Sequence, residues 1–412
     1  MAQKQQLMLS PDLPWKVRLL LFINSFAVNN SLNSNGTVNR TFLNLFDLKS
    51  SPSKNPINGV KSFDITVDPS RELWFRLYTP TTTTTTATSL PIIINFHGDG
   101  FILMAANSKP FDKFCRRLAR EIPSSIVSAV NYRLAPEHKY PCQYEDGFDV
   151  LKFIDEENLE HFPQNANLKQ SFLAGDSAGG NIAHHVALKA SESKASESKF
   201  LKLQVIGLTA LQPFFGGEER TVSENKLDRA PVIKVEHTEW FWKAFLPEGS
   251  NRDHATANVF GPNSVDISRV NFPATIVFVG GFYPVQDWQK KYYEGLHKAG
   301  KEANLIEYEN AFHSFYAFPE LPEYSLMIKE ISYLEITKHS EEKQQMRLIL
   351  ICVKDTRCNI ENRYYLEKHV MHKMLINLAI PILVQNPQNC KHSKAYKATS
   401  VLLLGLPTDD SA

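Results

Sequence analysis

The chain has 412 residues, of which 43% are hydrophobic, so it is long enough for one large domain with appendages and can bury a sizeable core. Its 45 basic and 44 acidic residues leave a formal charge of +1. This balance excludes the basic surface of nucleic-acid binders and the polybasic stripe of membrane-surface proteins, and it favours a neutral small molecule as the partner.

The cysteine pattern indicates a reducing compartment. The five cysteines have no metal-ligand spacing and form no dense disulfide framework, and their odd number favours free thiols. We therefore expect a cytoplasmic protein without a metal site and without a cofactor.

The first apolar segment in chain order is "LLLFINSFAV", Leu19 to Val28. A long polar segment precedes it, no small-residue cleavage site of a signal peptide follows it, and ten residues cannot span a bilayer. We expect an amphipathic helix that caps a groove and no membrane span. Residues 1–60 are accordingly predicted to form an N-terminal helical lid.

From about residue 60, short apolar segments alternate with helical segments. The expected strands are Pro91 to Phe96, Ser125 to Tyr132, Ser171 to Gly175, Leu203 to Leu211, Ala274 to Gly280 and Asn304 to Tyr308. The expected helices are Phe111 to Glu121, Glu145 to Glu157, Ala178 to Ala190 and Asp287 to Gly300. This alternation indicates an α/β fold with a mostly parallel central sheet and helices on both faces. Residues 61–338 are the predicted core domain.

Three further segments are predicted to lie outside the chemistry. The threonine-rich stretch Thr79 to Ser89 reads as a flexible connector, and the tandem duplication Ala190 to Lys199 as a solvated loop. The alternation stops near residue 340, so residues 339–412 are predicted to be a poorly ordered extension. A partner-binding tail is the alternative for this extension.

The strongest local signal is "LAGDSAGGN", in which an expected strand leads into a helix through Gly175, Asp176, Ser177, Ala178 and Gly179. This is a G-x-S-x-G pattern in the strand–turn–helix context that it requires. The glycines permit a sharp turn that lifts the serine oxygen above the sheet, and the next amide opens a helix. Ser177 is the predicted nucleophile, and a tight turn with an incidental serine is the alternative.

A serine nucleophile needs a base, which in this chain order comes after a late strand. His313 in "NAFHSFY" follows the strand Asn304 to Tyr308 and is the predicted base. The other histidines before residue 340 do not lie at that place, and each is expected to be an ordinary packed or solvated side chain. They include His138, His184, His185, His237 and His254.

The third requirement is an oxyanion hole made of backbone amides. "FHGDGF" ends an early strand with a sequence close to the HGGG loop, which makes Gly98, Asp99 and Gly100 the candidates, together with Ala178 after the serine. Asp99 departs from the HGGG pattern, which has glycine at this position. The departure is unfavourable, because a carboxylate would lie beside a developing oxyanion.

Together, "FHGDGF", "VNYRLAPEHKYPCQYEDG", "AGDSAGGNIAHH" and "NAFHSFY" resemble the hormone-sensitive-lipase-like branch of the α/β hydrolases. Within that branch they are similar to the plant carboxylesterases that also gave rise to the gibberellin receptor. The resemblance covers roughly residues 10 to 335. It implies an α/β-hydrolase fold, with Ser177 as nucleophile, His313 as base, and oxyanion amides from Gly98 to Gly100 and Ala178.

The family's acid is the first aspartate of G-x-D-P-L-x-D, and this chain reads Gly281-Phe282-Tyr283-Pro284-Val285-Gln286-Asp287. Tyr283 therefore stands where the resemblance places the acid. A tyrosine oxygen is neutral near pH 7 and sits on a longer arm, so it substitutes poorly for a carboxylate. Asp287 is the candidate substitute acid, and a helix-start residue is its alternative interpretation.

Three hypotheses follow, in order of preference. The first is a serine carboxylesterase with weakened activity on a small-molecule ester. The second is a non-catalytic small-molecule binder on the same fold. The gibberellin receptor is altered at the histidine and keeps the acid, whereas this chain keeps the histidine and lacks the acid. The third is a non-functional paralogue.

Overall fold

The computed structural model describes residues 11 to 337 except for 12, 82–89, 123–125, 157–161, 194–199, 229 and 231. The chain divides into two units, Met1–Glu335 and Ile336–Ala412. The expected extension 339–412 and most of the threonine-rich connector lie outside the described residues. No helix in the described part of the chain is long and apolar enough to cross a membrane.

One mixed sheet of eight strands runs through the first unit in the order β1-β2-β4-β3-β5-β6-β7-β8. The strands are β1 (Val60–Asp68), β2 (Leu73–Pro80), β3 (Leu90–Phe96), β4 (Ile126–Asn131), β5 (Ala166–Asp176), β6 (Val205–Leu211), β7 (Ala274–Phe282) and β8 (Ala303–Phe312). β2 pairs antiparallel with β1 and β4, and the remaining pairs are parallel. All six expected strands are confirmed, and β1 and β2 extend the sheet at one edge.

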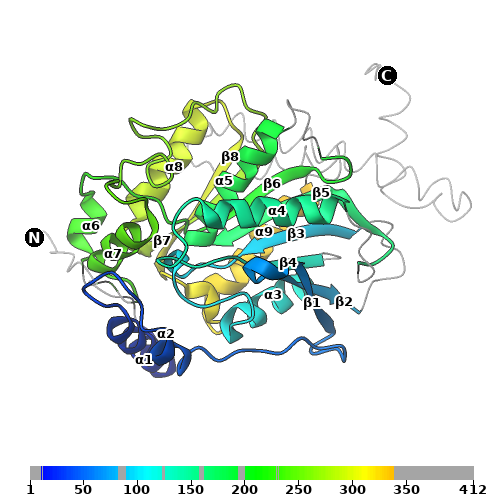
Figure 1. Ribbon diagram of the computed structural model, residues 1–412, viewed down its shortest axis with the longest axis horizontal. Helices are drawn as coiled ribbons and strands as arrows, with labels where there is room; N and C mark the ends of the chain where they lie inside the picture. The colour runs from blue at the N-terminus through cyan, green and yellow to red at the C-terminus, as the bar shows by residue number, and fades with distance from the viewer. Residues whose placement is uncertain are drawn as a thin grey trace, which may run out of the picture. The chain divides into compact units, whose positions relative to one another are not determined.

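Helices cover both faces of this sheet (Figure 1). They are α1 (Trp15–Ser31), α2 (Arg40–Asn44), α3 (Lys109–Glu121), α4 (Cys142–Glu156), α5 (Ala178–Ser193), α6 (Val222–Lys226), α7 (Val235–Phe245), α8 (Gln286–Lys298) and α9 (Pro322–Thr337), with 3-10 turns η1 (Pro69–Arg71), η2 (Asp99–Phe101) and η3 (Phe315–Ala317). The four expected core helices are confirmed. The predicted loop from Ala190 is wrong in its first part, because α5 continues to Ser193 and Ala190 is buried in it.

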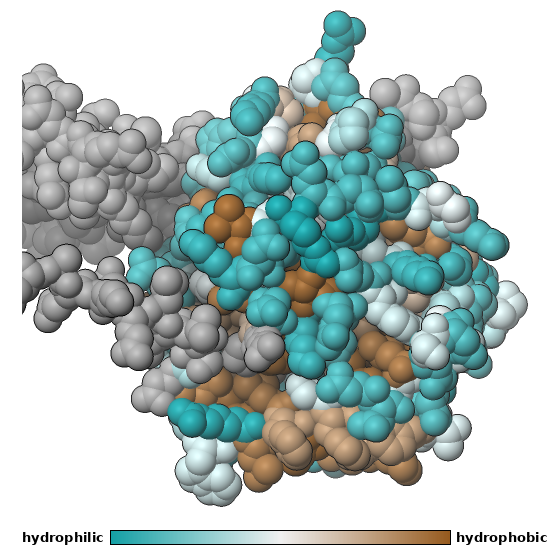
Figure 2. Space-filling model, turned by 90° about the vertical axis from the view of Figure 1, so that its left-hand side faces the viewer, coloured by the Kyte–Doolittle hydropathy of each residue, from teal (hydrophilic) through white to brown (hydrophobic). Residues whose placement is uncertain are grey.

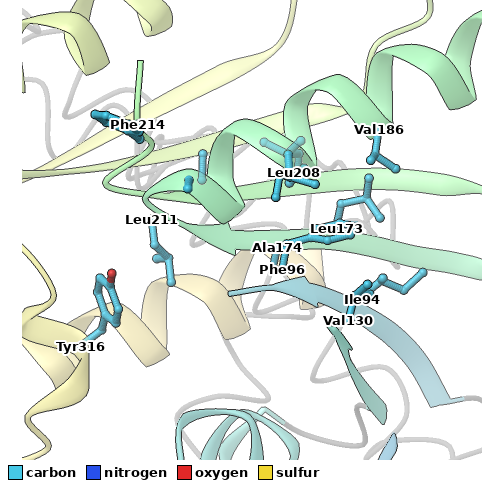
Figure 3. Packing of buried hydrophobic residues seen from close by; sticks show 14 of the residues in the cluster. Ile94, Phe96, Val130, Leu173, Ala174, Val186, Leu208, Leu211, Phe214 and Tyr316 are labelled. Atoms are coloured by element: carbon cyan, nitrogen blue, oxygen red, sulfur yellow. The ribbon is translucent and has the colours of Figure 1, made fainter. Parts of the chain in front are cut away.

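Part of the core fills the space between the sheet and α5 (Figure 3). The middle strands are apolar at consecutive positions because both of their faces are covered, and β3 is buried along its whole length. The side chains that meet there include Ile94, Phe96, Val130, Leu173, Leu208 and Val186. This packing fixes the carboxyl ends of β3, β5, β6, β7 and β8, where the candidate site lies.

The segment before the sheet is helical as expected, but α1 is not amphipathic. Val17 and Val28 are buried, whereas Trp15 and Phe22 are 69% and 70% exposed. Hydrophobic side chains accordingly gather at the lower end of the view in Figure 2, over α1 and α2. The apolar segment therefore contributes to the core with one face only, and its other apolar face lies at the surface.

Candidate active site

Ser177 lies between the end of β5 and the first residue of α5. Its φ of 50° is in the left-handed region, which costs free energy for a residue with a side chain. The turn is tight because α5 approaches β3 closely, and a Cβ on Gly179 would lie 2.0 Å from the backbone oxygen of Phe96. The strand–turn–helix geometry expected from the sequence is therefore present.

The backbone of Ser177 is held by the neighbouring strand. Its amide donates to the carbonyl of Leu211 at 2.9 Å, and its own carbonyl accepts from the amide of Phe214 at 2.8 Å. These bonds anchor the turn to the end of β6. The strained conformation at Ser177 is thus fixed on both sides by buried backbone hydrogen bonds.

His313 follows β8 directly, and its side chain is 2% exposed. Burial lowers the pKa of His313 to about 3, so the imidazole is neutral at physiological pH. Its Nδ1 is buried and has no hydrogen-bond partner among the residues that the structure describes. A neutral imidazole can accept a proton, but in the described part of the chain no carboxylate bonds to Nδ1 to stabilise the cation that this produces.

Tyr283 contacts both His313 and Ser177. Its ring stacks on the imidazole with the centroids 4.0 Å apart and the planes 18° from parallel. A stacked ring offers its face to the imidazole, whereas a bond to Nδ1 must lie in the imidazole plane. Burial raises the pKa of the Tyr283 hydroxyl, and the neighbouring Ser177 side chain lowers it by less. Among the described residues, this hydroxyl forms no hydrogen bond of ordinary geometry. Tyr283 therefore takes the acid's place without its hydrogen bond.

Asp287, the candidate substitute acid, forms its hydrogen bond elsewhere. Its Oδ2 accepts from the amide of Ser223 at 2.8 Å, so it caps the start of α6. The Ser223 hydroxyl in turn donates to the carbonyl of Pro284 at 2.7 Å. The structure does not bring Asp287 to the open Nδ1 of His313, because these bonds hold the loop against α6.

The loop after β3 has three successive residues in the left-handed region, with φ of 63° at Asp99, 67° at Gly100 and 69° at Phe101. Tertiary contacts hold this strained backbone in place. Phe101 stacks on Phe245 with the centroids 3.9 Å apart, and its carbonyl accepts from the amide of Ala135 at 3.0 Å. The loop is therefore rigidly placed beside the start of α5.

The four expected oxyanion amides fall into two groups. No backbone hydrogen bond from the amides of Asp99, Gly100 or Ala178 is found in the described residues, so these donors are unpaired there. The amide of Gly98 instead faces the carboxylate of Asp176 and lowers its pKa. Gly98 thus helps to fix the loop, and the other three amides are the available donors.

Two buried carboxyl groups interact here, that of Asp99 in the loop and that of Asp176 at the end of β5. Burial raises the pKa of Asp176 to about 7, against the opposing effect of the Tyr316 hydroxyl, which donates to its Oδ2 at 2.7 Å. Burial, and after it the charge of Asp176, raises the pKa of Asp99 well above that of an ordinary aspartate. The environment therefore favours the neutral acid at Asp99, which reduces the electrostatic conflict with an oxyanion.

Two of the other histidines have hydrogen-bond partners that fit a structural role. On α5, the Nδ1 of His184 lies 3.0 Å from the Tyr292 hydroxyl, and on α7 the Nε2 of His237 lies 2.6 Å from Oδ1 of Asn29. Within the described ranges, no group of three or more histidine, cysteine, aspartate or glutamate residues is arranged to hold a metal ion.

Sequence reasoning missed two residues that border the site. Gln212 follows β6 and bonds to the backbone on both sides of His313, through Phe312 and Ser314. Tyr316 reaches Asp176 from η3. Neither received a role from the sequence, although Tyr316 ends the quoted segment "NAFHSFY" and Gln212 begins the segment "QPFFGGEERT" directly after an apolar strand.

Comparison with known proteins finds relatives of two kinds, receptors and esterases, on one fold. Residues 93–317 match a family described as having the alpha/beta hydrolase fold. The gibberellin receptor GID1C of Arabidopsis thaliana is 40% identical over 308 residues, which are 72% of this chain and 87% of the receptor. Carboxylesterase 20 of the same plant is 34% identical, with 68% of this chain and 86% of the esterase covered.

A third relative and a solved structure are also esterases. The 3-O-acetylpapaveroxine carboxylesterase CXE1 of Papaver somniferum is 33% identical, covering 67% of this chain and 86% of that enzyme. A hyperthermophilic esterase of Pyrobaculum calidifontis is 27% identical, with a TM-score of 0.56 over 68% of this chain and 86% of that chain.

Proposed function

Because the chain belongs to the α/β-hydrolase family, with plant carboxylesterases among its relatives, we propose that it is a serine carboxylesterase with slow turnover. Its substrate is a small or medium carboxylic ester, and the reaction passes through an acyl-enzyme. The observation that carries the proposal is the strained, anchored turn at Ser177, whose side chain lies beside Tyr283, which in turn stacks on the buried His313.

In the proposed mechanism Ser177 attacks the ester carbonyl and His313 accepts the serine proton. The open amides of Asp99, Gly100 and Ala178 hold the oxyanion. His313 then gives the proton to the leaving alcohol, and a water molecule hydrolyses the acyl-enzyme with His313 again as the base. No metal or cofactor takes part in these steps.

The slow rate follows from the environment of His313. Each proton transfer to His313 creates an imidazolium in a buried site that, among the described residues, offers no hydrogen-bond acceptor at Nδ1. Serine hydrolases that lack the acid lose about 10⁴-fold in turnover, yet they remain above the uncatalysed rate because the serine, the histidine and the oxyanion hole persist. We expect this chain to lie in that range.

The helices α1 and α2 are proposed to form the lid over this site. Trp240 on α7 donates through Nε1 to the carbonyl of Asn33 at 3.1 Å, which ties the segment after α1 to α7. Arg40 at the start of α2 donates to the carbonyl of Ile102, directly after the oxyanion loop, and at 2.7 Å to that of Ala135. These bonds support a cover that is coupled to the loop. A cytosolic location is part of the same proposal and is tested by imaging a fluorescent fusion.

Reaction of a fluorophosphonate probe with the purified protein tests the nucleophile. We expect the wild type to be labelled and to hydrolyse p-nitrophenyl acetate, and Ser177→Ala to lose both. Ser128→Ala is the matched control, because Ser128 is a fully buried serine on β4 whose hydroxyl has no partner in the described structure. Labelling that survives in Ser177→Ala, or a hydrolysis rate that Ser177→Ala leaves unchanged, would contradict the proposal.

A non-catalytic small-molecule binder is the second candidate function. Two observations favour it: four relatives named as gibberellin receptors are 34% to 40% identical, and the place of the acid is filled by Tyr283. In that case the probe leaves Ser177 unmodified and Tyr283→Asp gains no esterase activity, while a ligand still raises the melting temperature of Ser177→Ala. A chain that neither reacts nor binds would be the non-functional paralogue.

A further inference from the structure

Gln212 lies directly after β6 and is fully buried. Its φ of 44° turns the chain away from the strand direction, and its amide donates to the carbonyl of Phe278 on β7 at 2.9 Å. The preceding residue, Leu211, accepts from the amide of Ser177. Gln212 is therefore attached to the same strand end that anchors the predicted nucleophile.

The side-chain amide of Gln212 bonds to the backbone on both sides of His313. Its Nε2 donates to the carbonyl of Phe312 at 3.2 Å, and its Oε1 accepts from the amide of Ser314 at 3.0 Å. The amide fits only in this orientation. If it were flipped, Oε1 would face the carbonyl of Phe312 and Nε2 would face the amide of Ser314. The planar amide thus fixes the positions of the residues before and after the histidine at once.

The amide has little freedom to leave this position. A Cβ on Gly280 would lie 2.1 Å from Nε2 of Gln212, so the side chain fills the space above the glycine backbone. Ser314, on the other side of the histidine, has a φ of 68°, a strained conformation that needs support from its surroundings. The hydrogen bond from Ser314 to Gln212 supplies that support.

We infer that Gln212 is the positioning residue for His313 and that, together with the stacked Tyr283, it replaces the orienting role of a carboxylate in this chain. The inference rests on the proposed function. A carboxylate would hold the imidazole through Nδ1, which is without a partner here. The ring can then be oriented only through the backbone that carries it and the ring that packs on it. A misplacement of about 1 Å at a catalytic group can cost about 10²-fold in rate.

The first test compares Gln212→Met with Gln143→Met. Methionine has nearly the length of glutamine but forms neither bond. Gln143 is the control because it is also fully buried and its Nε2 also donates to two carbonyls, those of Arg133 and His138, away from His313. We expect Gln212→Met to lower kcat for p-nitrophenyl acetate by about 10- to 100-fold with KM within threefold. Gln143→Met should keep kcat within threefold at a similar loss of thermal stability.

Gln212→Glu provides a readout that a purely structural role would not give. As a carboxylate it can accept from Ser314 but repels the carbonyl of Phe312. When protonated it can also donate to Phe312, and burial raises the pKa of such a group. We expect the kcat of this variant, divided by that of the wild type at the same pH, to rise as pH falls from 8 to 5. In the wild type, His313 stays neutral throughout this range, because burial lowers its pKa to about 3.

The third measurement does not depend on esterase activity. With histidine labelled by ¹³C at Cε1 and the His313 signal assigned through its loss in His313→Gln, we expect one sharp signal in the wild type. In Gln212→Met this signal should shift or broaden, and in Gln143→Met it should not. If the wild-type serine does not react, the proposed function fails. The His313 signal then still tests whether Gln212 positions the histidine. An unchanged His313 signal in Gln212→Met, or kcat within threefold of an active wild type, overturns the inference.

Discussion

Tyr283 differs from an acid in shape as much as in charge. Its ring lies flat against His313, so the phenol oxygen cannot reach the plane in which Nδ1 forms a hydrogen bond. The same burial that holds Tyr283 in place lowers the pKa of His313, because no charge compensates for the lost solvation. The base is therefore always in its neutral form but is weak.

The variant Tyr283→Asp tests this account through the pH dependence of the rate. In the wild type, His313 is neutral above a pKa of about 3, so we expect kcat/KM to show no rise between pH 5 and 8. A carboxylate at residue 283 favours the imidazolium and raises the histidine pKa, which should produce a rise in rate through pH 6 to 7. We expect kcat to increase by about 10²- to 10⁴-fold at pH 8.

Tyr283→Phe is the control for that experiment, since it keeps the stacked ring and removes only the hydroxyl. Its rate should stay within about threefold of the wild type, because the hydroxyl makes no hydrogen bond of ordinary geometry. A wild-type profile that already rises through pH 6 to 7, or a Tyr283→Asp variant without a gain, would refute the assigned role of Tyr283.

Asp99 supplies a second pH dependence, of opposite sign. Its pKa is raised, so the neutral acid persists to higher pH than in an ordinary aspartate. The oxyanion hole is least disturbed while the Asp99 carboxyl is protonated. As pH rises through that raised pKa, a negative charge forms beside the hole and kcat/KM should fall. In Asp99→Asn the fall should disappear, with the low-pH rate within about threefold of the wild type. Equal declines in both proteins would exclude Asp99 as the titrating group.

At the level of elements, the turn between β5 and α5 depends on close backbone contact. In Gly179→Ala the new Cβ would meet the Phe96 oxygen, which belongs to a fully buried strand and cannot move freely. We expect the free energy of unfolding to fall by about 2 to 4 kcal/mol and probe labelling to be lost.

Gly300→Ala separates this clash from the general cost of replacing a glycine. Gly300 has a φ of +71° but nothing within 4 Å of the added Cβ, so its replacement should cost only about 1 to 2 kcal/mol and leave labelling intact. Chemical denaturation measures both variants. Equal losses of stability would show that the contact with β3 is not what requires Gly179.

For the whole molecule, the first unit contains every strand of the sheet and every candidate site residue. The proposed domain boundary implies that residues 339–412 are not needed for folding. A chain that ends after residue 338 should melt within about 2 °C of the full chain and react equally with the fluorophosphonate probe. A lower melting temperature, or loss of labelling, would show that the extension is part of the folded protein.

The order of the strands brings the separate motifs together. β5, β6, β7 and β8 are parallel neighbours, so their carboxyl ends lie in one row and carry Ser177, Gln212, Tyr283 and His313 in turn. The oxyanion loop follows β3, which pairs with β5 on the other side. Residues more than a hundred positions apart therefore meet because parallel strands end at the same edge.

The sequence by itself determined the fold class, the six central strands and the motifs, because apolar runs and glycine-serine turns are local signals. It also located the departure at Tyr283. Only the tertiary structure decided that Tyr283 stacks on His313 and that Asp287 caps α6. It also decided that Gln212 bonds to the backbone on both sides of the histidine. These facts depend on side-chain directions and on bonds between distant segments, which no local pattern encodes. The burial that shifts the pKa values of Asp99 and His313 likewise exists only once the sheet is assembled.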